Sequence, residues 1–130
     1  ATLPKVVAWG ECGLDYYDKK TGGEILNAEY RLAQRDVFVR QLRIAAELDK
    51  PLVVHTRAAE ADTLELMTEH WPTTRPVHVH CFTSSAAMAR ELLVRFPSLY
   101  IGFTGVVTFT NAATVHEAVA LVPLERLLLE

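Results

Sequence analysis

The stretch PLVVHTRAAEADTLELMTEHWPTTRPVHVHCF, residues 51–82, contains the pattern that decides the fold. Its short apolar runs at Pro51–Thr56 and Pro76–Phe82 are typical of buried strands, and Ala58–His70 between them has the period of a helix. A strand, a helix and a second strand in this order form a βαβ unit, in which the two strands run parallel. The stretch therefore predicts an α/β fold.

The same alternation continues on both sides of residues 51–82. Three further segments have helical periodicity, and three further short apolar runs are typical of strands. Together they predict five strands alternating with four helices, which form a parallel sheet covered by helices. The additional helices are expected at Ala28–Asp49, at Ser84–Phe96 with Ser84 as N-cap, and at about Asn111–Val122. The additional strands are expected at Lys5–Glu11, Leu99–Phe103 and Arg126–Glu130, with a long loop at Asp18–Asn27.

The length of the repeating unit favours a barrel. Each strand and helix together take about 26 residues, so eight units would take roughly 208, within the range of a (β/α)8 barrel. We therefore expect residues 1–130 to be about five βα units of a partial TIM barrel. The alternative is an open, doubly wound sheet, which usually carries a glycine fingerprint in its first βα turn. The spacing Gly10-x-x-Gly13 does not match that fingerprint, and no P-loop motif occurs.

The composition excludes several classes of protein. Half of the residues are hydrophobic and 22% are charged, which excludes intrinsic disorder. Thirteen Lys and Arg against sixteen Asp and Glu give a formal charge of −3, which argues against a basic nucleic-acid scaffold or a membrane-surface module. No apolar run approaches the roughly 20 residues of a membrane span. Cys12 and Cys81 are far apart and are interpreted as reduced, which favours an intracellular protein, cytoplasmic or nuclear.

Both ends of the sequence lie close to predicted strands. Ala1 comes just before the first one, and the apolar run Leu127–Leu129 has no turn after it. We therefore interpret residues 1–130 as the central to C-terminal part of a single, longer barrel domain. Because a sheet cut from a barrel has unpaired edges, the isolated chain is expected to aggregate or to fold loosely, and to be weakly active or inactive.

Polar residues suited to metal binding and catalysis recur where the predicted strands end. Glu11 ends the first strand, His55 the second and His80 the third. In a parallel barrel these ends open on one face, where active sites are built. Imidazole and carboxylate groups bind divalent ions, so the three residues predict a catalytic metal centre. His78 shares a strand face with His80 and is expected to lie one layer deeper, as a supporting residue.

Some of these residues also have structural interpretations. A single His at a strand end is often only a hydrogen-bonded residue, and Glu11 could form a salt bridge with Arg57. Arg57 could equally bind a phosphate, since its planar guanidinium matches two oxygens. Cys81 beside His80 suggests a thiol nucleophile, but neighbours in a strand point to opposite faces, so the two side chains are not expected to meet.

Six segments stand out in order along the whole chain. They are Gly10-Glu11-Cys12-Gly13-Leu14-Asp15-Tyr16, Phe38-x-x-Gln41-Leu42-x-x-Ala45, Lys50-Pro51-Leu52-Val53-Val54-His55-Thr56-Arg57, Val79-His80-Cys81-Phe82-Thr83, Tyr100-Ile101-Gly102-Phe103 and Leu128-Leu129-Glu130. In order and spacing these segments resemble the TatD-like metal-dependent deoxyribonucleases. The family commonly has Gly where this chain has Ser84. The family's H-x-H pair on the first barrel strand, and its Asp after the final E-T-D segment, have no counterpart in these 130 residues.

The resemblance implies a TIM-barrel hydrolase with a two-metal centre. Glu11 would bridge the two ions, and His55 and His80 would bind the second one. Mg²⁺ or Mn²⁺ is the expected metal, with Zn²⁺ as the alternative because of the two imidazoles. The expected substrate-binding residues are Arg57, Asp15 and Tyr16.

The activity implied is that of a deoxyribonuclease with 3'-5' exonuclease character, acting on single strands or strand ends of DNA. Two alternatives stay open. The metal barrel could hydrolyse another bond, in an amide, ester or deamination substrate, since one fold supports many chemistries. The chain could also be a truncated, non-catalytic barrel module. The sequence indicates no membrane association and no particular protein partner.

Overall fold

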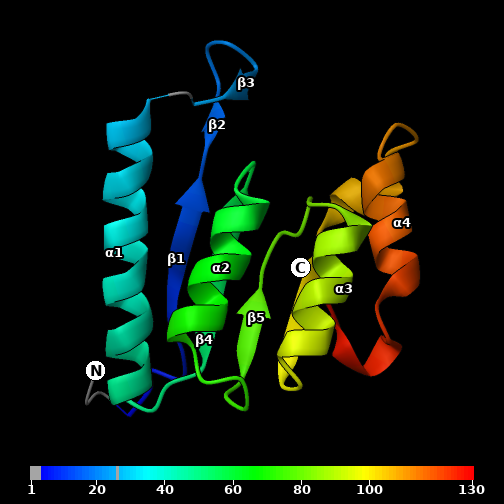
Figure 1. Ribbon diagram of the computed structural model, residues 1–130. Coiled ribbons are helices and arrows are strands. Elements are labelled where there is room, and N and C mark those ends of the chain that lie inside the picture. Colours follow the sequence, from blue (N-terminus) through cyan, green and yellow to red (C-terminus); the bar gives the residue numbers. More distant parts are fainter. Residues whose placement is uncertain (1–3, 26) are drawn as a thin grey trace.

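The computed structural model describes residues 4–25 and 27–130. Within these residues a parallel sheet of five strands, a small hairpin and four α-helices confirm the α/β class (Figure 1). The sheet strands are β1 (Trp9–Asp15), β4 (Leu52–Arg57), β5 (Val77–Val79), β6 (Leu99–Phe103) and β7 (Leu127–Leu129). The helices are α1 (Ala28–Glu47), α2 (Glu60–His70), α3 (Ala86–Arg95) and α4 (Ala113–Leu121). The hairpin pairs β2 (Tyr17–Asp18) with β3 (Gly23–Glu24), and the 3₁₀ turns are η1 (Gly105–Thr108) and η2 (Leu124–Arg126).

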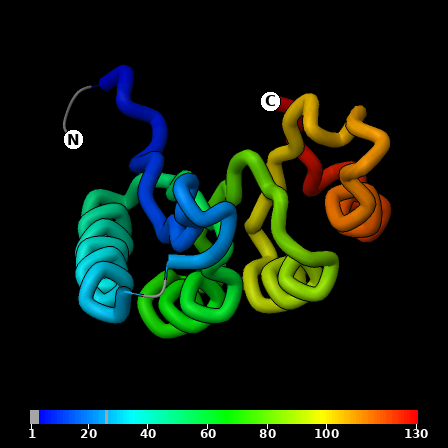
Figure 2. Tube along the Cα trace, turned by 90° about the horizontal axis from the view of Figure 1, so that it is seen from above, coloured from blue at the N-terminus to red at the C-terminus, as the bar shows by residue number. Residues whose placement is uncertain are grey.

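The strand order distinguishes a barrel from a doubly wound sheet. The order is β1-β4-β5-β6-β7, so each strand pairs with the next sheet strand along the chain. Seen from above, the helices form an arc along one side of the strands (Figure 2). A doubly wound sheet reverses its order and carries helices on both faces, whereas a barrel advances in one direction with its helices outside. The fold is therefore that of a partial (β/α)8 barrel.

The two faces of the sheet differ in polarity. In β4, Leu52, Val54 and Thr56 are buried, whereas the alternate residues Val53, His55 and Arg57 are half-buried on the opposite face. The buried face packs against the helices, which contribute large apolar side chains to the core. The histidines of the sheet therefore lie on the face away from the helical layer.

None of the helices in the described part of the chain has both the length and the apolar composition needed to cross a membrane.

The first helix forms as its sequence predicts. The Asn27 side chain caps α1 by accepting the Tyr30 backbone N–H at 2.9 Å. Phe38, Leu42 and Ala45, spaced four and three residues apart, are its buried residues. The helix ends at Glu47, slightly before the expected end at Asp49, because Asp49 has a φ of 53° that no α-helix accommodates.

The first strand lies later in the chain than its sequence predicts. The expected bounds Lys5–Glu11 were wrong: β1 begins at Trp9 and runs through Gly13 to Asp15. Gly13 pairs with His55 of β4, and a Cβ at position 13 would overlap the His55 carbonyl oxygen. Its φ of 155° is also one that residues with side chains rarely adopt. Glycine therefore marks a close approach of two strands here.

Smaller differences follow from local hydrogen bonding. The Ser85 hydroxyl, and not that of Ser84, caps α3 by accepting the Met88 N–H, while Ser84 is buried. The expected loop at Asp18–Asn27 contains most of the β2–β3 hairpin. The expected strand Pro76–Phe82 is shorter, because β5 ends at Val79 and Cys81 has a φ of 47°. His80 therefore lies just beyond its strand.

Tyr16 joins the end of β1 to two helices. Its side chain is 2% exposed, and its hydroxyl donates a hydrogen bond to Asp62 Oδ2 of α2 at 2.6 Å. Arg35 of α1 pairs with Asp62 Oδ1 at 2.7 Å. Burial, and then the hydrogen bond to Asp62, raises the pKa of Tyr16 to about 12. This connection fixes the carboxyl end of β1 against α1 and α2.

The close approach at Gly13 is tested by Gly13→Ala in the full-length protein. We expect a loss of about 2 kcal/mol or more in the free energy of unfolding, since the added methyl overlaps backbone and the φ is unfavourable. Denaturant unfolding measures this value. Gly105→Ala is the control, because a Cβ there meets nothing within 4 Å, and it should change stability by about 0.5 kcal/mol or less. Equal stabilities of the two variants would contradict the β1–β4 contact described above.

The Tyr16–Asp62–Arg35 connection predicts a pH dependence. Burial alone would raise the pKa of Asp62, but hydrogen bonds from Tyr16 and Arg35 hold it below its usual value. Its contribution to stability is therefore present above the unfolded-state pKa of about 3.9 and is lost as the pH falls through the folded pKa. Asp62→Asn should cost about 1–2 kcal/mol at pH 7, and this difference from the parent protein should shrink below about pH 4.

Unfolding measured from pH 7 to pH 3 tests this expectation. Glu65→Gln is the matched control, since Glu65 pairs with the same Arg35 but its side chain is 57% exposed. A constant difference between parent and Asp62→Asn over this pH range would show that the Asp62 carboxylate is not stabilised by these partners.

Candidate metal centre

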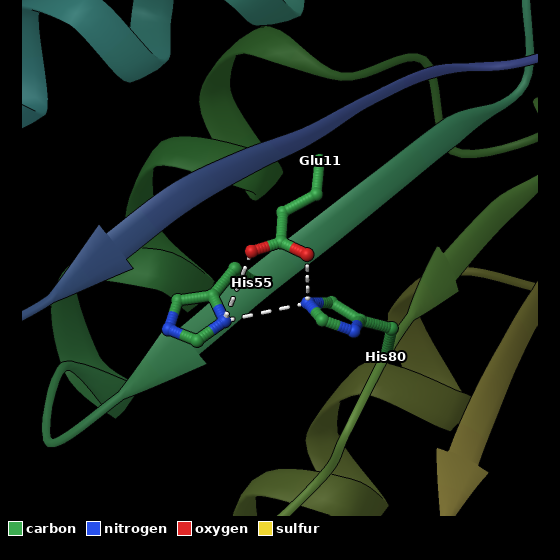
Figure 3. A group of neighbouring side chains, drawn as sticks. All are labelled: Glu11, His55 and His80. Atoms are coloured by element: carbon green, nitrogen blue, oxygen red, sulfur yellow. Dashed lines mark hydrogen bonds and ion pairs between the residues drawn. The ribbon is translucent and has the colours of Figure 1, made fainter. Parts of the chain in front are cut away.

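The sheet register brings Glu11, His55 and His80 together from three elements, although they are far apart in the sequence (Figure 3). Glu11 lies inside β1, at an irregularity of pairing between Trp9 and Cys12. His55 lies in β4 on the face away from the helices, and His80 follows β5 directly. The expectation that Glu11 ends its strand was wrong, but the bulge brings its side chain to the two histidines.

The three side chains present their donor atoms to one another. His80 Nε2 lies 2.9 Å from Glu11 Oε2, His55 Nδ1 lies 3.8 Å from Glu11 Oε1, and the two ring nitrogens are 3.3 Å apart. Donors bound to one ion at about 2.0–2.2 Å lie roughly 3.0–3.5 Å from each other. Two of these separations are close to that range and the third, to the other oxygen of Glu11, is slightly longer, so the carboxylate and the two imidazole nitrogens could hold one divalent ion.

The three side chains differ in their exposure to solvent. The Glu11 side chain is 54% exposed, whereas those of His55 and His80 are 27% and 16% exposed. The carboxylate is therefore open to solvent while the two rings are held by the protein. The group is therefore accessible from solvent on the side of Glu11.

Each imidazole also faces a second carboxylate with its other nitrogen. His55 Nε2 lies 3.6 Å from Asp15 Oδ2, and His80 Nδ1 lies 3.8 Å from Glu130 Oε2. These separations are those of neighbouring charges and exceed a hydrogen bond. Histidines that bind metals commonly have a carboxylate on the far side of the ring, which fixes its orientation and basicity.

Cys81 lies closer to His80 than the sequence suggested. The expectation that the two side chains cannot meet was wrong, because Cys81 follows the end of β5 and strand alternation does not apply to it. Burial, and then its hydrogen bond to Glu130, raises the pKa of the Cys81 thiol to about 11. The thiol donates a hydrogen bond to Glu130 Oε2 at 3.2 Å, a contact that favours its protonated form.

Arg57 lies near the centre but makes no ion pair with Glu11. Its guanidinium carbon is 3.8 Å from the centre of the Tyr17 ring, in a cation–π contact. Arg57 follows His55 by two residues in β4, so both lie on the same sheet face, with Arg57 nearer the carboxyl end. The guanidinium thus lies over the Tyr17 ring, on the same sheet face as His55.

Asp15 and Tyr16 are held mainly by contacts within the protein. Asp15 Oδ1 accepts the Tyr17 N–H at 3.0 Å, and its backbone N–H donates to Gln34 Oε1 at 2.8 Å. Tyr16 lines a cavity of about 380 Å³ beside the start of α2. Asp15 is thereby fixed 3.6 Å from His55 Nε2, while the Tyr16 hydroxyl is bound to Asp62.

Two residues of the site were not recognised as such in the sequence. Tyr17 carries no motif, although an aromatic residue next to Tyr16 at a strand end could have indicated a partner for Arg57. Glu130 was noted only as a strand end, although a carboxylate directly after Leu127–Leu129 needs a partner as much as Glu11 does.

Comparison with known proteins gives a consistent result over the chain. Residues 1–130 match the family model described as TatD related DNase. The human "3'-5' RNA nuclease TATDN2" is 43% identical over 127 residues, which cover 98% of this chain and 16% of that protein. "Uncharacterized metal-dependent hydrolase YcfH" of Escherichia coli K12 is 42% identical over 96% of this chain and 43% of its own length. The Citrobacter rodentium "3'-5' ssDNA/RNA exonuclease TatD" is 41% identical over 100% and 46%, respectively. The chain thus spans less than half the length of these relatives.

Solved structures agree with this assignment. YJJV, a TatD homologue from Escherichia coli K12, superposes with a TM-score of 0.81 and 29% identity, over 98% of this chain and 45% of its own. An uncharacterized amidohydrolase from Saccharomyces cerevisiae gives a TM-score of 0.74 at 28% identity, over 93% and 39%. The resemblance inferred from the six sequence segments is confirmed by the family model, which covers every residue. The chain belongs to the TatD related DNase family.

Proposed function

We propose that the protein is a metal-dependent phosphodiester hydrolase that removes nucleotides from single-stranded ends of DNA. The observation that carries the proposal is the convergence of Glu11, His55 and His80, whose donor atoms all lie within 4.8 Å of one another. The names of the relatives support the same chemistry, since two are described as 3'-5' nucleases and one as a metal-dependent hydrolase. The activity is proposed for the whole protein and not for this chain alone.

Glu11, His55 and His80 would hold the ion. A bound divalent ion lowers the pKa of a coordinated water and stabilises negative charge on a phosphodiester. Glu11 contributes the negative charge of the ligand set, and its exposed position leaves one side of the site open to substrate. Asp15 and Glu130 hold the two rings from behind. The remaining nitrogen of each ring is thereby directed towards Glu11.

The metal is proposed to be Mg²⁺ or Mn²⁺, with Zn²⁺ as the alternative. A carboxylate suits hard ions such as Mg²⁺, and two imidazoles suit softer ones, so Mn²⁺ fits both kinds of donor. A second ion is part of the proposal through the resemblance to the family. As the resemblance implies, Glu11 would be shared by the two ions, and His55 and His80 would bind one of them.

Substrate contact is proposed for Arg57, supported by Tyr17. With a net charge of −3 the chain has no broad basic surface to hold nucleic acid, so the grip on phosphate must be local. A guanidinium held flat over an aromatic ring presents its N–H donors in a fixed plane, which suits two phosphate oxygens. This arrangement is consistent with binding of strand ends.

The metal assignment is tested by His80→Ala in the full-length protein. We expect a loss of at least about tenfold in metal-dependent nuclease activity, because even residues behind a ligand contribute roughly 10- to 100-fold. Mn²⁺ content and hydrolysis of a labelled oligonucleotide are measured together. His116→Ala is the control, since His116 is exposed on α4. Unchanged metal content and activity in His80→Ala would refute the assignment.

The reaction itself is tested by comparing substrates on the metal-loaded, full-length protein. Single-stranded DNA, single-stranded RNA of the same sequence and a generic carboxylic ester are each incubated with and without EDTA. We expect EDTA-sensitive release of nucleotides from DNA. Release from RNA alone would correct the substrate, and hydrolysis of the ester alone would refute the proposed function.

The role of Arg57 is tested by Arg57→Ala and Arg57→Lys. Loss of a hydrogen bond to a charged group costs about 1.5–3 kcal/mol, so Arg57→Ala should raise KM for single-stranded DNA about tenfold or more. Arg57→Lys should recover only part of this, because a lysine lacks the planar fork. Mn²⁺ affinity should not change in either variant. Arg43→Ala, on the exposed side of α1, is the control, and an unchanged KM in Arg57→Ala would remove the residue from substrate binding.

A further inference from the structure

Glu130 is the centre of a second group of contacts, one layer behind the candidate metal centre. Its Oε2 accepts the Cys81 backbone N–H at 3.1 Å and the Cys81 thiol at 3.2 Å. Its Oε1 lies 2.7 Å from His78 Nε2, in an ion-pair contact. The side chain is 22% exposed, so the protein encloses most of the carboxylate. A single carboxylate therefore connects two residues of the segment that carries His80.

These contacts cross an intervening strand. Glu130 follows β7, while His78 lies in β5, and β6 lies between the two strands. The carboxylate reaches across because position 102 of β6 is glycine, where a Cβ would overlap Glu130 Oε1 and His78 Nε2. Gly102 is thus an opening in the sheet face that the Glu130 carboxylate fills.

The Cys81 N–H is the donor that the sheet itself leaves without a partner. His80 N donates to Val54 O of β4 at 3.0 Å, and Phe82 N donates to Gly102 O of β6 at 2.8 Å. Between them, Cys81 turns with a φ of 47°, and its N–H points at Glu130. Three successive N–H groups therefore bind β4, the Glu130 side chain and β6. By accepting the Cys81 N–H, the Glu130 carboxylate holds this turn from the side of β7.

We propose that Glu130 is a positioning residue for His80, holding the turn after β5 so that His80 Nε2 points at Glu11. The inference rests on the proposed function in taking His80 as a metal ligand. His80 lies between two carboxylates, with Nε2 at 2.9 Å from Glu11 and Nδ1 at 3.8 Å from Glu130. In this role Glu130 would act on His80 and would not itself bind the ion or the substrate. It acts by limiting the positions that the imidazole can take.

The test uses the full-length protein and Mn²⁺ as the probe, with affinity measured by titration calorimetry. Glu130→Ala should weaken Mn²⁺ binding about 10- to 100-fold, as expected for loss of a residue behind a metal ligand. Glu130→Gln, whose amide oxygen can still accept the Cys81 N–H, should weaken it less. Glu125→Ala, in the exposed η2 turn, should leave it unchanged. Parent-like Mn²⁺ affinity in Glu130→Ala would overturn the proposal.

A double-mutant cycle separates positioning from general packing. Gly102→Ala should weaken Mn²⁺ binding in the parent, and its effect should be smaller in Glu130→Ala, where only the overlap with His78 Nε2 remains. Additive effects of the two substitutions would contradict the arrangement. Should these variants fail to fold, hydrogen exchange of the Cys81 amide in the parent protein provides the answer. The amide should be protected, and exchange at the rate of an exposed amide would overturn the proposal.

The same titrations distinguish this inference from the proposed function. Failure of the parent protein to bind Mn²⁺, or a His80→Ala variant that binds it normally, would refute the metal centre. Weakened binding in His80→Ala together with normal binding in Glu130→Ala would refute only the positioning role of Glu130.

Discussion

The contact between Gly13 of β1 and the backbone of His55 in β4 is the constraint on which the site depends. A side chain at position 13 would overlap the His55 carbonyl oxygen, so the two strands approach as closely as backbones allow. Glu11 precedes Gly13 by two residues and is displaced by the irregular pairing between Trp9 and Cys12. The close approach therefore sets the distance between the Glu11 carboxylate and the imidazole of His55. Strand pairing, rather than any contact of the three side chains, places the carboxylate at the histidines.

Two further carboxylates, Asp15 and Glu130, lie near the other nitrogens of the two imidazole rings. His55 lies between Glu11 and Asp15, and His80 lies between Glu11 and Glu130. Asp15 is fixed by hydrogen bonds with Gln34 and Tyr17, and Glu130 by the turn at Cys81. In the proposed function, the shared Glu11 faces the ion and the two outer carboxylates face the protein. Each ring then has one nitrogen for the metal and one for its support.

Sequence patterns predicted the parts of the fold in which side chains alternate or repeat. The strand predicted at Pro51–Thr56 from a short apolar run corresponds to β4, and the helix with Phe38, Leu42 and Ala45 was predicted from its helical period. The bounds of the first strand were wrong because its pairing with β4 requires a glycine at position 13. A pattern of hydrophobic residues does not show that requirement. Glu11, His55 and His80 could be proposed because their residue types suit a metal and each lies near a predicted strand end. The contacts of Glu130 could not, since they depend on space left by Gly102 in a neighbouring strand.

Charge explains why the proposed metal and substrate would depend on each other. Glu11, Asp15 and Glu130 surround the two histidines, and the chain as a whole carries a formal charge of −3. A phosphodiester is also an anion, so without a cation its approach to these carboxylates is repelled. Arg57 offsets one negative charge. A divalent ion at Glu11 would offset two and would lie at the position that the phosphate must reach. In the proposed function, binding of the ion and of nucleic acid at this edge of the sheet would therefore be coupled through the same carboxylates.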